Sequence, residues 1–131
     1  MSIDTMGNFL TIIRNGIMVS KSTVTIPYSK LKFEVAKILK SEGFIRDAII
    51  EEVDSSKKNI KVFLKYVENE SVIHEIIRVS RPGKRAYVGI NKFKPVIGGL
   101  GVSILTTSKG VMTDKKAKSL LLGGEILCTV W

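Results

Sequence analysis

Apolar residues near the start of the chain recur three or four positions apart, which is the spacing of one face of a helix. Asp4 precedes them and can accept hydrogen bonds from the first free N–H groups of such a helix. Gly16 lies near its expected end. The spacing therefore predicts a first helix that begins after Asp4 and runs to about Ile17. Its buried stripe comprises Met6, Phe9, Leu10, Ile13 and Ile17.

The pattern then changes to alternation and back to helical spacing. "STVTIP", residues 22–27, is β-branched and alternating, which predicts a short strand that Pro27 ends. Ser29 is placed to cap a second helix, and Gly43 lies where its C-terminal cap belongs. "FIRDAIIEEV" and "IKVFLKYV" flank the polar run 54–59 and predict a β-hairpin. Residues 1–70 therefore read as a compact αβαββ lobe. The stripe expected on the second helix comprises Leu31, Val35, Ile38 and Leu39.

The second half of the chain is richer in short apolar runs, separated by Gly, Pro and Lys. We expect "TDKKAKS", residues 113–119, to be its one short helix, with Thr113 or Asp114 as N-cap. The predicted fold class is α+β in two small lobes, residues 1–70 and a mainly antiparallel β lobe of residues 71–131. The expected strands are "SVIHEIIRVS", which suits a helix almost as well, "AYVGI", "VSILTT" and "EILCTVW".

The charge of the chain narrows the class of partner. Its 131 residues carry a net charge of +9, which favours a polyanionic partner, either nucleic acid or an anionic membrane surface. Residues 71–131 hold 10 Lys and Arg against 3 Asp and Glu, so we expect the binding surface there. A run of about 20 apolar residues, which a membrane span needs, is absent, and so is the pattern of a signal peptide. The single Cys128 favours a reducing cytoplasm.

Catalytic chemistry has little support. His74 and Cys128 are the only residues of their types, and each lies in an apolar run, so isolated positions are commoner for them than a Cys–His pair. A zinc site needs about four ligands at closer spacing. "GGLGVSILTTSKG" fits no nucleotide-phosphate motif, because Lys109 precedes Gly110 and a third glycine is missing. We expect no catalytic residue, metal or cofactor.

Two segments could instead contact nucleic acid. "RVSRPGKR" places cations, among them Lys84 and Arg85, around a Pro-Gly turn, and Tyr87 follows with a ring on which a base could stack. A solvated charged face is the alternative. In "LTTSKGVMTD" the hydroxyls of Thr106, Thr107 and Ser108 could bond the shallow RNA minor groove. Lys109 could meet a phosphate and Gly110 would allow close approach. A strand end with a surface turn explains the same residues equally well.

At this loop the chain resembles the bacterial ribosomal protein S-eight family, the eighth protein of the small ribosomal subunit. The resemblance rests on "TTSKGVMTD" followed by "GGEILCTVW", and it extends along the whole chain in the same order and spacing. The family usually has Ala-Gly where this chain has Leu120 and Leu121, so we expect the turn there to be more tightly packed or shifted. The other matching motifs are "IRNG", "SKLK", "EGFI", "LKY", "RVSRPGKRAY" and "GGLGVSIL".

The resemblance implies a structural constituent of the small subunit that binds a helix of the 16S ribosomal RNA central domain and helps to assemble the 30S platform. It also implies neighbouring small-subunit proteins as partners and repression of its own operon through a messenger RNA that mimics the ribosomal site. A general architectural nucleic-acid-binding protein is the alternative. The RNA-binding residues that the resemblance implies are Ser29, Lys30, Lys84, Arg85, Tyr87, Thr106, Thr107, Ser108, Lys109, Gly110 and Glu125.

Overall fold

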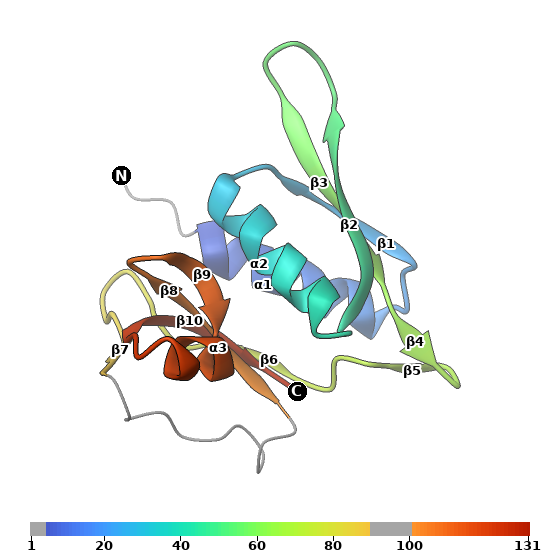
Figure 1. Ribbon diagram of the computed structural model, residues 1–131. Coiled ribbons are helices and arrows are strands. Elements are labelled where there is room, and N and C mark those ends of the chain that lie inside the picture. Colours follow the sequence, from blue (N-terminus) through green and yellow to red (C-terminus); the bar gives the residue numbers. More distant parts are fainter. Residues whose placement is uncertain (1–4, 90–100) are drawn as a thin grey trace. The chain divides into compact units, whose positions relative to one another are not determined.

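The computed structural model describes residues 5–89 and 101–131 (Figure 1). Asp4, the expected first cap, and Ile90, the end of the expected strand "AYVGI", lie outside these residues. The chain divides into two compact units. One is Asn8–Ile73, and the other joins the start of the first helix to His74–Trp131. Independent lobes of residues 1–70 and 71–131 stay a prediction, and each unit is described here by itself.

The Asn8–Ile73 unit has the expected αβαββ order. Its three long strands form an antiparallel sheet in the order β1-β3-β2, and β2 and β3 are the predicted hairpin (Figure 1). Two short strands, β4 and β5, follow and pair with each other. Strand β4 is the end of the expected strand "IKVFLKYV", which is interrupted at Lys65. The elements are α1 (Thr5–Met18), β1 (Thr23–Pro27), α2 (Lys30–Ser41), β2 (Ile45–Glu52), β3 (Lys58–Leu64), β4 (Tyr66–Val67) and β5 (Glu70–Ser71).

Helix α2 begins as its cap predicts, but its buried face only partly coincides with the predicted one. The Ser29 hydroxyl accepts a hydrogen bond from the Lys32 N–H at 3.2 Å, and Gly43 has a φ of +83° just after the helix. Lys32 and Ala36 are buried together with two members of the predicted stripe, whereas Leu31 and Ile38 are only half-buried. A lysine can contribute because its long aliphatic stem packs like an apolar side chain. The buried face of α2 comprises Lys32, Val35, Ala36 and Leu39.

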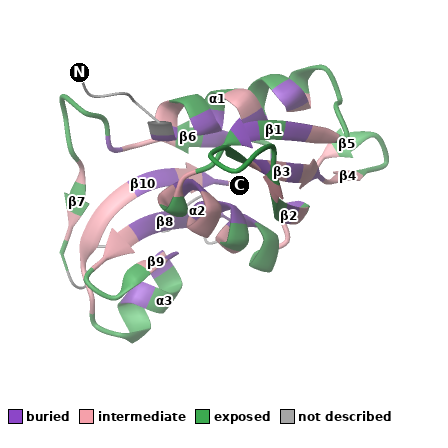
Figure 2. Ribbon diagram, turned by 90° about the horizontal axis from the view of Figure 1, so that it is seen from above, coloured by how far each residue is buried: buried purple, intermediate pink, exposed green. Residues whose placement is uncertain are grey.

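Within its described residues the second unit is mainly antiparallel with one short helix, as predicted. Its sheet has the order β6-β10-β8-β9, and β7 pairs with β10 as well, so β10 contacts three strands. Buried residues follow β8 and β10 (Figure 2). The elements are β6 (Ile76–Arg78), β7 (Tyr87–Val88), β8 (Val102–Thr107), β9 (Gly110–Thr113), α3 (Asp114–Ser119) and β10 (Gly124–Val130).

Two strand expectations for this unit were partly wrong, and one strand was not predicted. Only Ile76–Arg78 of "SVIHEIIRVS" lies in β6, because the N–H groups of His74 and Glu75 both donate to the Trp131 carbonyl instead of to a continuous ladder. "AYVGI" forms only the two-residue strand β7 within the described residues. Strand β9 was missed: the chain reverses before Gly110 and pairs with β8 before α3 begins.

The end of α3 holds a leucine where glycine is favoured. The Leu122 N–H donates to the Ala117 carbonyl at 2.9 Å, and the Leu121 N–H donates to the Lys118 carbonyl at 3.1 Å. These two bonds form a Schellman motif, which requires the left-handed conformation at its first residue after the cap. Leu121 adopts it with a φ of +57° and is 64% exposed. The backbone of this turn is therefore compact, but the Leu121 side chain is exposed and is not tightly packed as expected.

Candidate nucleic-acid interface

Three strands of the second unit align three of the predicted site residues in one row. Glu125 of β10 lies opposite Tyr87 of β7 on one side and Thr106 of β8 on the other, and Thr106 lies opposite Val111 of β9. Residues directly opposite each other in antiparallel strands project to the same face of the sheet. The structure thus brings Tyr87, Glu125 and Thr106 together on one face, which we call the Tyr87–Thr106 row.

Two glycines allow this row to close. A Cβ on Gly124 would overlap the carbonyl oxygen of Thr106, and a Cβ on Gly123 would overlap that of Val88. Only glycine can bring the backbones this close, so "GGE" is required by the approach of β10 to β7 and β8. The sequence contained the motif, but nothing local in it revealed which strands would approach.

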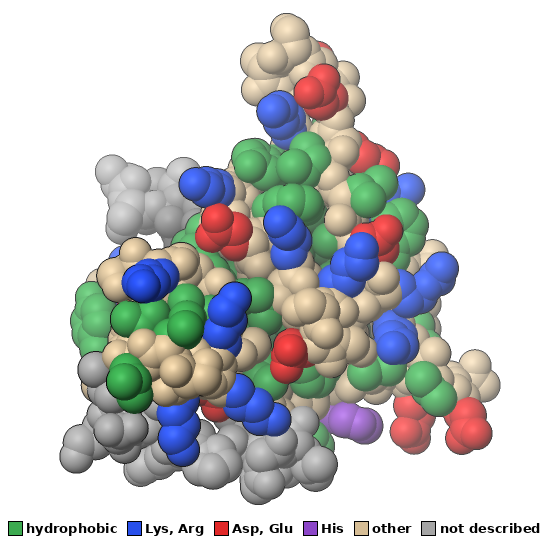
Figure 3. Space-filling model, in the orientation of Figure 1, with side chains coloured by type: hydrophobic (Ala, Val, Ile, Leu, Met, Phe, Trp, Pro, Cys, Tyr) green, Lys and Arg blue, Asp and Glu red, His purple; other side chains and the backbone are tan. Residues whose placement is uncertain are grey.

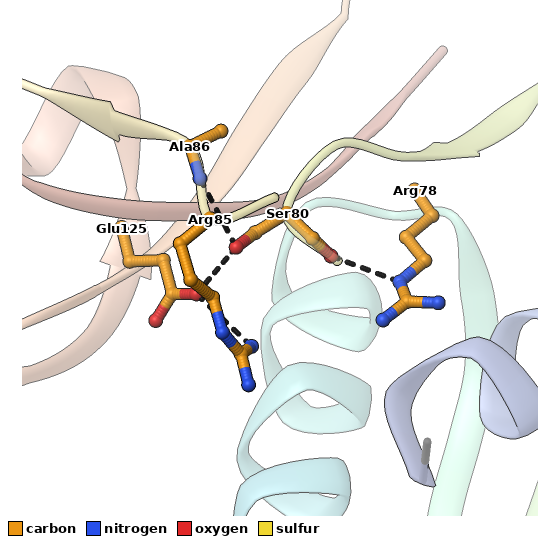
Figure 4. Close-up of polar contacts among 5 residues, drawn as sticks. All are labelled: Arg78, Ser80, Arg85, Ala86 and Glu125. Carbon is orange, nitrogen blue, oxygen red and sulfur yellow. Dashed lines mark hydrogen bonds and ion pairs between the residues drawn. The ribbon is translucent and has the colours of Figure 1, made fainter. Parts of the chain in front are cut away.

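The carboxylate of Glu125 ties β10 to the segment that precedes β7. The hydroxyl of Ser80 and the guanidinium of Arg85 both donate to Glu125 Oε2, the latter at 3.3 Å (Figure 4). Ser80 Oγ also accepts a hydrogen bond from the Ala86 N–H at 3.2 Å, and the Ala86 carbonyl accepts one from the Ile126 N–H at 2.9 Å. The carboxylate therefore braces the basic turn.

Ser80 is the member of this network that sequence reasoning missed. It is buried, and it lies 45 positions from Glu125 in the chain. The Ser80 carbonyl accepts a hydrogen bond from Arg78 Nε at 2.9 Å, so both the side chain and the backbone of Ser80 are hydrogen-bonded (Figure 4). The motif "RVSRPGKR" contains Ser80, but only its cations suggested a function from the sequence.

The basic turn itself is short and open. Arg81 and Lys84 exchange backbone hydrogen bonds of 3.0 Å in both directions across Pro82 and Gly83. The side chain of Arg85 is 51% exposed despite its ion pair with Glu125. Tyr87 follows with 72% of its surface exposed. The turn therefore presents cations and one aromatic ring to solvent beside the Tyr87–Thr106 row.

The loop of three hydroxyls is a tight hairpin between β8 and β9. Thr107 lies opposite Gly110, so Ser108 and Lys109 form the turn, and Gly110 has a φ of +108°. The Thr107 hydroxyl accepts from the Lys109 N–H at 3.1 Å and donates to the Gly110 carbonyl at 2.8 Å. Because consecutive strand residues project to opposite faces, Thr106 and Thr107 do not share a surface. Thr107 shapes the turn, whereas Ser108 and Lys109 are exposed at its tip.

Helix α3 adds cations that sequence reasoning had not assigned to the site. Lys115, Lys116 and Lys118 are all exposed, and the buried Asp114 accepts a hydrogen bond from the Ser103 N–H at 3.4 Å. Basic side chains lie over the part of the molecule that contains α3 and β9, as they do elsewhere on the face shown (Figure 3). The pattern of "TDKKAKS" predicts a helix but does not show which of its lysines face solvent. Exposed lysines of this kind could meet phosphates.

Ser29 and Lys30 belong to the other unit. The Ser29 hydroxyl is engaged as the N-cap of α2, and Lys30 is exposed. Their contact with RNA stays a prediction.

The residues considered for catalysis do not form a reactive centre. Burial raises the pKa of the Cys128 thiol from 9.0 to about 12, so the thiol stays protonated at neutral pH. The His74 ring stacks on Trp131, with 5.4 Å between ring centroids. Within residues 5–89 and 101–131, three or more His, Cys, Asp or Glu side chains never gather as a metal site would require. Across the same residues, no helix combines the length and apolarity needed to cross a membrane.

Comparison with known proteins agrees with the resemblance. A family model described as Ribosomal protein S8 matches residues 4–131. Three relatives carry the name small ribosomal subunit protein uS8. The protein from Solibacter usitatus is 50% identical over 132 residues, which cover 100% of both chains. Those from Cellvibrio japonicus and Enterococcus faecalis are 51% and 48% identical, over 98% of this chain and 97% of their own. The chain therefore belongs to the ribosomal protein S8 family.

Proposed function

We propose that this chain binds one helix of the 16S ribosomal RNA central domain directly, through the Tyr87–Thr106 row and the hairpin tip beside it. The coarser statement follows from the family: the chain is a structural protein of the small ribosomal subunit and not an enzyme, and its place is the cytoplasmic ribosome. RNA recognition by specific residues and the part played in platform assembly belong to the proposal.

The observation that carries the proposal is the alignment of Tyr87, Glu125 and Thr106 on one face of the sheet. The three residues lie on three paired strands, and paired strands position contacts more precisely than free loops do. The Tyr87 ring offers a stacking surface for a base or ribose, and the Thr106 hydroxyl offers a donor and an acceptor to the minor groove.

The exposed cations supply the second part of the mechanism. Lys109 at the hairpin tip, Lys84 at the basic turn and the lysines of α3 are all exposed in this unit. Phosphate contacts of this kind position an RNA helix without reading its sequence. Shape recognition by the row and a salt-dependent phosphate contribution from the lysines would then act together.

The test compares binding to the cognate 16S RNA helix with binding to a scrambled duplex, by filter retention. Ser108→Ala should weaken cognate binding by about 1–3 kcal/mol, the usual loss when a buried polar partner is left unpaired, and Thr106→Val should act in the same direction. Thr11→Val, at an exposed threonine of α1, is the matched control and should bind normally. Unchanged preference for the cognate helix in Ser108→Ala and Thr106→Val would refute the assignment.

Two extensions can be separated in the same assay. Repression of its own operon, which the family resemblance implies, predicts that Ser108→Ala weakens binding to the operon messenger RNA and to the ribosomal helix in parallel. A general architectural protein would bind duplex DNA as well as structured RNA, so equal competition by duplex DNA would favour that alternative. A footprint on deproteinised 16S RNA confined to one central-domain helix would support the proposal.

A further inference from the structure

One edge of the sheet in the Asn8–Ile73 unit is open. Within the described residues β1 pairs only with β3. The Leu64 N–H donates to the Ser22 carbonyl at 2.9 Å, and the Tyr28 N–H donates to the Lys58 carbonyl at 3.1 Å. Bonding to the neighbour alternates along an antiparallel strand, so the backbone groups of Thr23 and Thr25 point away from β3. These groups form an unpaired strand edge.

A groove runs along this edge, between β1 and the second half of α1. It has a volume of about 520 Å³. Its helix side follows positions of one helical face, and Gly16 permits the close approach, because a Cβ there would overlap the side chain of Val24. The lining residues are Ile12, Asn15, Gly16, Val19, Lys21, Thr23, Val24 and Thr25.

The chemistry of the groove differs from that of the Tyr87–Thr106 row. Among the described residues that line it, Lys21 is the one that carries a charge, and Val19 is 66% exposed. An RNA strand would need several cations there. A polypeptide in extended conformation instead satisfies unpaired backbone N–H and C=O groups and places alternate side chains in pockets beside the edge.

We propose that this groove binds an extended polypeptide segment, which adds to β1 as a fourth strand and inserts an apolar side chain between Ile12 and Val19. The segment would belong to a neighbouring protein of the small subunit, so the inference rests on the proposed assembly into that particle but not on the RNA contacts of the row. Pro27, the last residue of β1, has no N–H to donate, so pairing with the added strand should end there.

Amide hydrogen exchange tests the pairing directly. In the free chain the amides of Thr23 and Thr25 should exchange rapidly, whereas those of Val24 and Ile26, which face β3, should be protected. In small-subunit particles that contain the protein, exchange at Thr25 should slow about tenfold or more. Equal exchange at Thr25 in the free chain and in the particle would overturn the proposal.

A photoreactive benzophenone residue in place of Val19 identifies the occupant. In the particle it should form an adduct with a polypeptide segment of another ribosomal protein. The same residue in place of Val53, an exposed valine of the β2–β3 turn, is the control and should not give that adduct. An adduct with ribosomal RNA alone, one with a second copy of this chain, or none would each contradict the proposal.

A pair of variants at Thr25 then isolates the backbone bond. Thr25→Val keeps the outward N–H and should retain the Val19 adduct. Thr25→Pro removes that N–H at an edge position where proline is tolerated, and it should lower the adduct yield about tenfold. Binding of the free variants to the 16S RNA helix should be unchanged. If the wild-type chain does not bind that RNA helix, the RNA proposal is refuted. The exchange rate at Thr25 would still test the groove proposal independently.

Discussion

Replacing Leu121 tests whether the turn after α3 is strained as its backbone implies. Its φ of +57° brings the Cβ of any residue other than glycine close to the following carbonyl, at a cost of roughly 1–2 kcal/mol. Glycine relieves this strain but loses about 0.5–1 kcal/mol through its greater freedom in the unfolded chain. Leu121→Gly should therefore be more stable than Leu121→Ala by about 0.5–1 kcal/mol. Because Leu121 is 64% exposed, both variants lose little buried apolar surface.

The sign of this difference is the diagnostic result. At Lys118, an exposed position within α3, the order should reverse, and the free energy of unfolding of Lys118→Ala should exceed that of Lys118→Gly by up to about 1 kcal/mol. Equilibrium urea unfolding, followed by the fluorescence of Trp131, reports on the unit that contains both sites, since Trp131 is the only tryptophan. If Leu121→Ala proves at least as stable as Leu121→Gly, the strain argument is wrong.

Three further predictions follow from the same unit. Gly124→Ala should lower the free energy of unfolding, measured in urea, by about 1–3 kcal/mol, because the added Cβ overlaps β8. Gly83 has open space around it, so Gly83→Ala should change that energy by less than about 0.5 kcal/mol. The unfolded chain loses the Cys128 proton near pH 9.0 and the folded chain only near pH 12, so the unfolded state binds fewer protons in between. Stability should then fall by about 1.4 kcal/mol per pH unit as the pH rises through this window, and unfolding titrations of Cys128→Ala should lack that contribution. Lys84→Gln should reduce the salt dependence of RNA binding by a slope of about 0.7–0.9, and Lys57→Gln, at an exposed lysine of the other unit, should leave it unchanged in filter assays; equal slopes in both variants would count against a phosphate contact at Lys84.

Local signals in the sequence were sufficient for most of the elements. Ser29 and Thr113 cap the helices that follow them, because a short side-chain oxygen next to a helical pattern satisfies free N–H groups whatever the tertiary context. The β2–β3 hairpin was equally predictable from its flanking apolar runs. Strand β9 was not, since its four residues are too few to show a recognisable alternating pattern.

The candidate site depended on information that no local pattern contains. Resemblance to a family placed Tyr87, Thr106 and Glu125 among the residues expected to bind RNA, but only strand register shows that they form one row. Register is set by pairing over long sequence separations, as between Ser80 and Glu125. For the same reason the three consecutive hydroxyls seemed a single surface, whereas β8 turns Thr106 and Thr107 to opposite faces.

The central place of β10 has a consequence for the order of events during synthesis. Strands β6, β7 and β8 all pair with β10, which the ribosome makes after each of them. The sheet β1-β3-β2 is complete in the nascent chain about sixty residues before β10 appears, so the first unit can fold while the second still lacks its middle strand. We therefore expect the Tyr87–Thr106 row to form last in a growing chain. An incompletely translated copy should lack the row and should not bind RNA through it.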